Sequence, residues 1–180
     1  MRIAATALEG VFLVEIEPIG DDRGFFARNF CRKEFAAAGL RTDVAQCNMS
    51  LNRRRGTLRG MHFQEPPMAE AKLVRCVRGS IHDVVVDLRP DSRTYCRWLS
   101  VELSGDNRRA LYISEGFAHG FQTLSDDAEV HYVMFEFFSP GHAGGVRWDD
   151  PAFGIEWPLP DPIVSEKDRS YPPFRKKAPA

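Results

Sequence analysis

The sequence lacks the features that would place it in a membrane or make it a general binder of polyanions. Its 180 residues contain no run of about 18 apolar residues, so we expect no transmembrane helix. The apolar run within residues 1–10 is too short for the core of a secretory signal and predicts a first strand instead. The formal net charge of −1 indicates that the surface as a whole binds neither nucleic acid nor membranes.

The sequence also lacks two arrangements that commonly bind metals or perform redox chemistry. Its four cysteines, at positions 31, 47, 76 and 96, form no Cys-x-x-Cys pair, which argues against zinc knuckles and thioredoxin-like chemistry. Reduced, partly buried thiols in a cytoplasmic chain are the simpler interpretation. There is no His-x-His pair, and Gln64 occupies the second position after His62, so the set of potential metal ligands is poor. We therefore expect no metal.

What the sequence does contain is a series of short apolar runs rich in β-branched and aromatic residues, which favour strands. Turn residues such as Gly79-Ser80 and Pro90-Asp91 separate the runs at intervals of roughly 10 residues, which is typical of an all-β sandwich or barrel. The predicted strands are Lys72–Val77, Ile81–Leu88, Trp98–Leu103, Ala110–Ile113, Gly120–Leu124 and Glu129–Phe137.

A single domain over residues 1–180 is expected, because no repeat, linker or low-complexity tract interrupts the chain. One short helix is predicted over Arg32–Ala38, ended by Gly39. The segment Asp149–Pro162 is rich in proline and aromatic residues and is expected to wrap the barrel as irregular chain. Residues 171–180 contain three prolines and a basic cluster, and we expect them to form a mobile tail.

The segment around His62 is the most informative part of the chain. His62 is a potential base, Arg59 a potential anion binder, and Lys72 a potential electrophile on the following apolar run. On a strand, Gln64 shares a face with His62, and Gly60 is expected to let a ligand approach the backbone closely. Together these groups could remove a proton from a carbon beside a carbonyl in a phosphate-bearing substrate.

Three further residues could act at such a site, although each also has a structural interpretation. His119, between a predicted turn and a strand, could donate to a phosphate or to developing charge. Tyr132 lies on a predicted strand, where tyrosines often pack in the core, but it would be a suitable proton donor opposite His62. Asp168 lies in a charged stretch typical of an exposed turn, yet a buried carboxylate beside a histidine would fix its tautomer and raise its basicity. The remaining histidines are expected to be structural or surface residues: His82, His131 and His142.

Six ordered motifs give the chain its resemblance to a known family: Asp22-Arg-Gly-Phe-Phe26, Gln46-Cys-Asn-Met-Ser50, Leu58-Arg-Gly-Met-His-Phe-Gln64, Lys72-Leu-Val-Arg-Cys-Val-Arg-Gly79, Glu115-Gly-Phe-Ala-His-Gly-Phe121 and Ser165-Glu-Lys-Asp168. From about Val14 to Pro173 the sequence resembles the nucleotide-sugar 4-keto-6-deoxyhexose epimerases, of which dTDP-4-dehydrorhamnose 3,5-epimerase is the best-known type. The resemblance implies an all-β, cupin-type jelly-roll barrel with a few short helices. It also implies a homodimer that works without a metal or organic cofactor on a nucleoside-diphosphate 4-keto-6-deoxysugar, in deoxysugar biosynthesis.

The resemblance also implies roles for individual residues. His62 is similar to the general base of the family, with Asp168 as its partner, Tyr132 to the acid on the opposite face, and Lys72 to the residue that stabilises the enolate. Positions similar to those that contact diphosphate and sugar are Arg59, His119, Gln46 and Asn48. Arg23 and Phe26 are similar to nucleotide-contacting positions, often supplied across the dimer, and Phe138 occupies the position that stacks on the base.

Two departures from the family pattern concern the base of the nucleotide. Arg28 stands where the family usually has a glutamate that contacts thymine, and Ala143 stands where it has a second acid. A glutamate accepts a hydrogen bond from thymine or guanine, whereas an arginine only donates, which suits the acceptors of cytosine. This substitution predicts a CDP-linked sugar first, a dTDP-linked sugar second and a GDP-linked sugar third.

Three alternative functions remain open from sequence alone. One is an epimerase that acts at C-3 or C-5 only, because the same base and acid serve both positions. The second is a metal-dependent cupin enzyme, and the third is a binding module without catalysis. The presence of His62, Lys72, Tyr132 and Asp168 together argues against the third.

Overall fold

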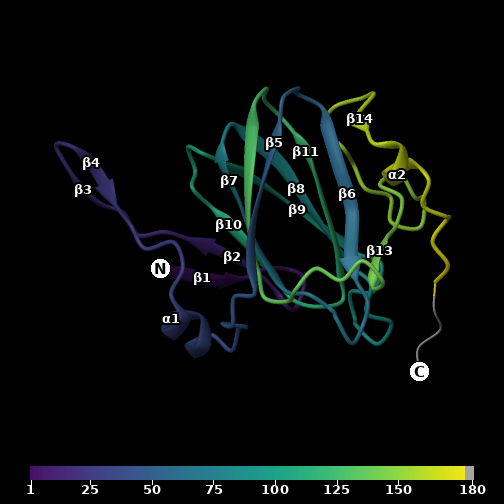
Figure 1. The fold of residues 1–180 in the computed structure, drawn as a ribbon, viewed down its shortest axis with the longest axis horizontal. Coiled ribbons are helices and arrows are strands. Elements are labelled where there is room, and N and C mark those ends of the chain that lie inside the picture. The colour runs from purple at the N-terminus through teal and green to yellow at the C-terminus, as the bar shows by residue number, and fades with distance from the viewer. Residues whose placement is uncertain (177–180) are drawn as a thin grey trace.

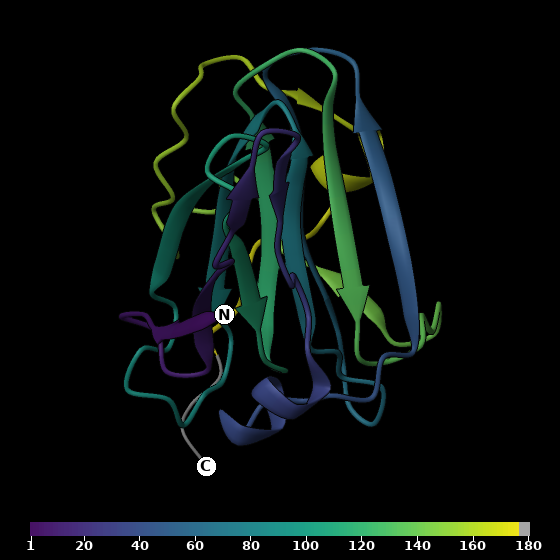
Figure 2. The same ribbon diagram turned by 90° about the vertical axis from the view of Figure 1, so that its left-hand side faces the viewer.

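The computed structural model describes residues 1–176, which are built around two facing β-sheets (Figures 1 and 2). The first sheet has the strand order β1-β2-β10-β7-β12-β5, and the second has the order β13-β6-β11-β8-β9, with β14 added beside β6. All strand pairs of the two sheets are antiparallel except β14 with β6. Within residues 1–176 this is the all-β architecture that the spacing of the apolar runs predicts.

The strands of the first sheet are β1 (Arg2–Ala5), β2 (Val11–Glu15), β5 (Gln46–Asn52), β7 (Lys72–Arg78), β10 (Ala110–Ile113) and β12 (Ala128–Met134). Those of the second are β6 (Thr57–Gln64), β8 (Ser80–Asp87), β9 (Trp98–Ser104), β11 (Phe117–Thr123), β13 (Ala143–Gly145) and β14 (Ile163–Val164). Outside the two sheets lie the hairpin β3 (Ile19–Asp21) and β4 (Gly24–Phe26), and the helices α1 (Arg32–Ala37) and α2 (Glu166–Arg169).

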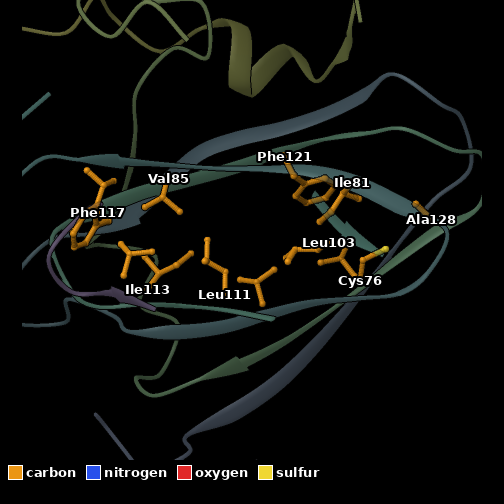
Figure 3. Close-up of a cluster of buried hydrophobic side chains, with 13 residues drawn as sticks. Cys76, Ile81, Val85, Leu103, Leu111, Ile113, Phe117, Phe121 and Ala128 are labelled. Carbon is orange, nitrogen blue, oxygen red and sulfur yellow. The ribbon is translucent and has the colours of Figure 1, made fainter. Parts of the chain in front are cut away.

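The main apolar core fills the space between the two sheets. Figure 3 shows Val85 and Phe121 projecting from one sheet towards Leu111 and Ile113 of the other, and all four are at most 1% exposed. Removing such side chains from water is the dominant favourable term in folding, at about 25 cal/mol per Å² of apolar surface. This core occupies one part of the interior, and polar side chains line the remainder.

The outer face of each sheet is covered by a different part of the chain. Phe35 of α1 is fully buried against the first sheet, where its ring lies 5.9 Å from that of Tyr112. The second sheet is covered by the irregular segment after β13 and by the chain after α2, and Phe153 of the former packs on Phe174 of the latter at a ring distance of 4.8 Å. Each outer face is therefore covered in part, while Met49 and Leu51 of β5 remain exposed on the first sheet.

The β3–β4 hairpin projects away from both sheets (Figure 1). Its apolar side chains are largely exposed, with Ile19 at 73% and Phe26 at 76%. Large exposed apolar side chains gathered on one element mark an interaction surface more often than a free one.

Several element boundaries differ from the sequence predictions. The strand expected over Gly120–Leu124 is β11 and begins at Phe117, so His119 lies within a strand and not before it. The strand expected to reach Phe137 ends at Met134, and the helix expected to reach Ala38 ends at Ala37. The one-turn helix α2, the β3–β4 hairpin and strand β5 were not predicted, because glycine, polar and single charged residues interrupt their apolar pattern.

The segment 149–162 contains no helix or strand, as predicted. Part of the tail expected to be mobile packs against the barrel, because Tyr171 contacts His62 and the N–H group of Phe174 donates to Asp150 Oδ2 at 2.7 Å. Residues 177–180 lie outside the described residues. Among residues 1–176, no helix is long and apolar enough to cross a membrane, and the four cysteines are free thiols.

Candidate active site

A cavity of about 370 Å³, lined by both polar and apolar side chains, opens between the two sheets. Strands β5, β7 and β12 form one wall, and β6 and β11 form the other. The predicted site residues that line this cavity are Asn48, Arg59, His62, Lys72, His119, Tyr132 and Phe138. The fold therefore brings together residues from five strands that the sequence spreads over about half of the chain.

His62 and Asp168 form the first carboxylate–histidine pair of the cavity. His62 Nε2 lies 2.7 Å from Asp168 Oδ1, and the Asp168 side chain is only 5% exposed. Asp168 Oδ2 accepts the N–H of Gly60 at 3.3 Å, and the N–H of Asp168 donates to Ser165 Oγ at the start of α2. The last contact is an N-cap, which fixes the single turn that presents the carboxylate. Asp168 is thus a buried group and not the exposed turn residue that its local sequence favours.

Burial and hydrogen bonding act in opposite directions on the Asp168 carboxyl. Burial acts to raise its pKa, while the hydrogen bond and the charge of His62 and the Gly60 N–H act to lower it. The net result is a pKa of Asp168 below its ordinary value, so the carboxylate is ionised at neutral pH. An ionised carboxylate can hold the histidine in one tautomer and stabilise its protonated form.

Gly60 and Gly120 allow β6 and β11 to approach closely beside His62. A Cβ atom on Gly60 would lie 2.6 Å from Gly120 Cα, and one on Gly120 would lie 2.7 Å from Arg59 O. Gly60 also has a φ of +135°, which disfavours any residue with a side chain. The expected close approach of a ligand at Gly60 is therefore replaced by the close approach of a neighbouring strand. The pairing of His119 with His62 across these strands directs both rings to the cavity.

His119 and Asp83 form a second carboxylate–histidine pair. His119 Nε2 lies 2.8 Å from Asp83 Oδ1, and both side chains are buried. Asp83 was not predicted, although the available signal was its position as one of two aspartates, with Asp87, within the apolar run Ile81–Leu88. A buried carboxylate requires a partner, so an acid in such a strand indicates one. The His119 ring in turn meets the edge of Tyr132, with ring centroids 6.4 Å apart.

Tyr132 projects from the first sheet, opposite His62 on the second. Its hydroxyl lies 3.5 Å from Ser50 Oγ, the distance at the outer limit of a hydrogen bond. Burial raises the pKa of Tyr132 to about 12. The hydroxyl therefore remains protonated at physiological pH and is available as a proton donor.

Lys72 enters the cavity from the start of β7. Its ammonium group lies 2.5 Å from Glu70 Oε1, and the exposed fractions of the two side chains are 6% and 10%. Lys72 pairs with Met134 across β7 and β12, and Tyr132 lies two residues before Met134, so all three side chains share one face of the sheet. Glu70 is a second residue that was not predicted, because nothing in its local sequence distinguishes it from a solvated charge.

Some of the predicted substrate-contacting residues line the cavity, and others only support the residues that do. Arg59 donates from Nε to Asn52 Oδ1 at 2.7 Å, while its side chain remains exposed. Gln46 does not line the cavity itself, but its side chain accepts the N–H of Phe138 and donates to Asn48 Oδ1. These hydrogen bonds hold the exposed ring of Phe138 at the entrance.

Arg23, Phe26 and Arg28 do not line the cavity of their own chain. Arg23 pairs with Asp21 on the β3–β4 hairpin, and Phe26 is exposed. Arg28 Nη1 lies 3.0 Å from Glu34 Oε1, so its guanidinium is engaged by α1. Arg28 is therefore not the free hydrogen-bond donor to a pyrimidine base that the sequence alone suggests, because it is paired with Glu34.

Within residues 1–176, no group of three or more His, Cys, Asp or Glu side chains is placed to hold a metal ion. The two histidines of the cavity are each paired with a carboxylate.

A histidine–carboxylate pair on one wall of a barrel, with a protonated tyrosine and a lysine on the other, defines an acid–base enzyme. Comparison of the chain with known protein families and structures identifies the kind of acid–base enzyme. A family model described as dTDP-4-dehydrorhamnose 3,5-epimerase matches residues 5–176, and the chain belongs to that family. It is therefore an isomerase of the epimerase type, with the predicted cupin-type jelly-roll fold.

Individual relatives agree with this assignment. The dTDP-4-dehydrorhamnose 3,5-epimerase of Methanothermobacter thermautotrophicus is 47% identical over 179 residues, covering 97% of this chain and 95% of the relative. The dTDP-4-dehydrorhamnose 3-epimerase of Streptomyces niveus is 41% identical, covering 94% and 82%. A crystal structure of the 3,5-epimerase from Bacillus anthracis, with TDP and PPi bound, has a TM-score of 0.93 and 41% identity, covering 96% of this chain and 99% of that one.

Proposed function

We propose that this protein epimerises a dTDP-linked 4-keto-6-deoxyhexose at C-3 and C-5, in deoxysugar biosynthesis. The observation that carries the proposal is the position of His62 and Tyr132 on opposite sheets of one cavity. Inversion of a carbon requires removal of a proton from one face and delivery of a proton to the other. A base on one wall and an acid on the facing wall meet this requirement.

The reaction begins with proton abstraction by His62. The C-4 ketone acidifies the hydrogens at C-3 and C-5, but not enough for an unaided imidazole. Asp168 stabilises the imidazolium that forms, and it does so from a buried position 2.7 Å away. If the Nε2 proton is donated to Asp168, the unprotonated Nδ1 atom is the one that acts as the base.

Lys72 stabilises the enolate oxygen that develops at C-4. A preorganised donor of this kind contributes about 3–4 kcal/mol to the transition state, and more effectively where water is excluded. Tyr132 then delivers its proton to the opposite face of the carbon. Because burial keeps its pKa near 12, the hydroxyl is a weak acid whose proton matches the high basicity of an enolate.

The thymidine nucleotide is supported by the relatives, which are named as dTDP-sugar epimerases, and by the TDP in the Bacillus anthracis structure. The comparisons do not favour the CDP- or GDP-linked sugar that Arg28 suggests. The contact between Arg28 and Glu34 gives a physical reason for assigning this one substitution little weight. Arg59, His119, Asn48 and Gln46 are proposed to bind the diphosphate and sugar, and Phe138 to stack on the base.

The experiment is conversion of dTDP-4-keto-6-deoxyglucose by the purified protein, followed by NMR of the sugar ring. We expect inversion at C-3 and C-5, and no conversion by His62→Ala. Inversion at C-3 alone would place the protein with relatives such as the Streptomyces niveus 3-epimerase. Preferential conversion of the CDP- or GDP-linked sugar would overturn the choice of nucleotide.

A homodimer is part of the proposal, with Arg23 and Phe26 reaching the nucleotide of the partner subunit. It is supported by the exposed apolar side chains of the β3–β4 hairpin and by Met49 and Leu51 on the edge strand β5, which are 68% and 45% exposed. An unpaired edge strand with apolar side chains is a liability unless a partner covers it. Sedimentation of wild type and Phe26→Asp tests this, with a dimer expected for the first and weaker association for the second. A monomeric wild type at working concentration would contradict it.

A cytoplasmic location is likewise a proposal.

A further inference from the structure

Three basic side chains of the cavity are each paired with a carboxylate that is little exposed. His62 is paired with Asp168, and His119 with Asp83. The third pair is Lys72 with Glu70, whose side chain is 10% exposed. The first two carboxylates orient imidazoles, and the third stands in the same relation to an ammonium group. Glu70 has no role in the mechanism described above.

The Lys72–Glu70 contact is local in sequence but buried in the fold. Glu70 lies in the irregular connection between β6 and β7, and Lys72 is the first residue of β7. The 2.5 Å distance between Nζ and Oε1 is that of a short, charge-assisted hydrogen bond. An ammonium group has three N–H donors, so this bond leaves two for other acceptors in the cavity.

A free lysine side chain in a cavity of this size would sample several rotamers. Its flexible four-carbon stem loses conformational entropy when it is fixed in one rotamer. Contact with Glu70 restricts this freedom before substrate arrives. Catalysis by a charged donor depends on such preorganisation, because reorientation during the reaction would cost part of the stabilisation.

We propose that Glu70 is a positioning residue that holds the Lys72 ammonium against the C-4 oxygen of the substrate. This inference rests on the proposed function, because it gives Lys72 the enolate as its target. Glu70 acts through Lys72 alone and does not touch the reacting atoms. It therefore affects the stabilisation of the enolate and leaves nucleotide binding unchanged.

The test is a double-mutant cycle read by solvent deuterium exchange into dTDP-4-keto-6-deoxyglucose. The variants are Glu70→Ala, Glu70→Gln, Lys72→Ala and Lys72→Ala combined with Glu70→Ala. Glu65→Gln is the matched control, because Glu65 is an exposed acid in the same connection and does not line the cavity. Thermal unfolding and binding of dTDP are measured for every variant to separate loss of function from loss of fold.

We expect Glu70→Ala to lower the exchange kcat by about 10- to 100-fold, with KM and dTDP affinity changed less than about threefold. Glu70→Gln retains an oxygen acceptor for the ammonium group and should restore kcat to within about fivefold of wild type. In the Lys72→Ala background, removal of Glu70 should have no further effect, because its only target is gone.

Two results would overturn the proposal. The first is that wild type is active and Glu70→Ala has the same kcat. The second is that the double variant loses as much activity as the sum of the two single losses in free energy, so that Glu70 acts independently of Lys72. If Glu70→Ala does not fold, Glu70→Gln decides: a loss as large as that of Lys72→Ala contradicts positioning by an oxygen acceptor. Absence of exchange by wild type would overturn the proposed function itself, an outcome distinct from each of these.

Discussion

Asp168 and His62 lie 106 residues apart in sequence and share a hydrogen bond of 2.7 Å. Two local devices make this contact possible. The Ser165 cap begins the single turn of α2, and the Gly60 N–H holds the second oxygen of the carboxylate. These two contacts hold the carboxylate independently of His62. The carboxylate can therefore orient the imidazole.

Replacement of the carboxylate by an amide should be costly for catalysis. We expect Asp168→Asn to lower kcat by about 10²- to 10⁴-fold, because the imidazolium loses its counter-charge and the correct tautomer is no longer enforced. Steady-state kinetics measures the loss, with Glu166→Gln on the exposed side of the same helix as control. A kcat within twofold of wild type would show that His62 does not depend on Asp168.

The lowered pKa of Asp168 also predicts how stability responds to acid. A carboxyl whose pKa is lower in the folded state stabilises the fold at every pH above its pKa in the unfolded chain, which is near 3.8. This stabilisation is lost as the pH falls through the pKa of the folded state. Denaturant unfolding should therefore show a loss of stability below about pH 4 in wild type that is smaller in Asp168→Asn. Identical acid profiles for the two proteins would contradict the burial and pairing of this group.

Tyr132 should titrate late among the four tyrosines of the chain. Burial raises its pKa from 10.0 to about 12, so its proton is retained and its neutral form is favoured in the folded state. The stabilisation linked to this group is complete below pH 10 and is lost as pH rises towards 12. The difference in tyrosinate absorbance between wild type and Tyr132→Phe should appear only above about pH 11 while the protein is folded. A difference near pH 10 would indicate an exposed hydroxyl.

The close approach of β6 and β11 predicts a severe effect of one methyl group. In Gly120→Ala the new Cβ would lie 2.6 Å from Met61 Sδ and 2.7 Å from Arg59 O. We expect the free energy of unfolding to fall by about 1–3 kcal/mol, together with a loss of activity as His62 and His119 separate. Gly141→Ala is the control, because its Cβ would meet no atom within 4 Å. Equal stability of the two variants would contradict the strand contact.

The sequence predicted the β-barrel and most of the cavity for identifiable reasons. The strand over Ala110–Ile113 has the predicted bounds, because its apolar residues are continuous and turn residues flank them. His62, Lys72, His119 and Tyr132 do meet in one cavity, as the motifs imply. Motifs of this length carry tertiary information that a single residue does not.

The sequence did not predict contacts that depend on tertiary structure. Asp83 and Glu70 are ordinary acids in the sequence, and only the packing of two sheets buries them beside His119 and Lys72. The sequence alone favours room for a ligand at Gly60, because its partner Gly120 lies on a strand that only folding brings close. The contact of Arg28 with Glu34 of α1 likewise depends on the folded chain and has no signal in the sequence.

The central claim is that His62 and Tyr132 act on opposite faces of the same carbon. It is tested most directly by solvent deuterium uptake at C-3 and C-5 of dTDP-4-keto-6-deoxyglucose, read by NMR for wild type, His62→Ala and Tyr132→Phe. We predict deuterium with inversion for wild type, neither for His62→Ala, and deuterium without inversion for Tyr132→Phe, because the His62 imidazolium exchanges its proton with heavy water and returns a deuteron to the face from which the proton came. Full inversion by Tyr132→Phe, or undiminished exchange by His62→Ala, would contradict the account.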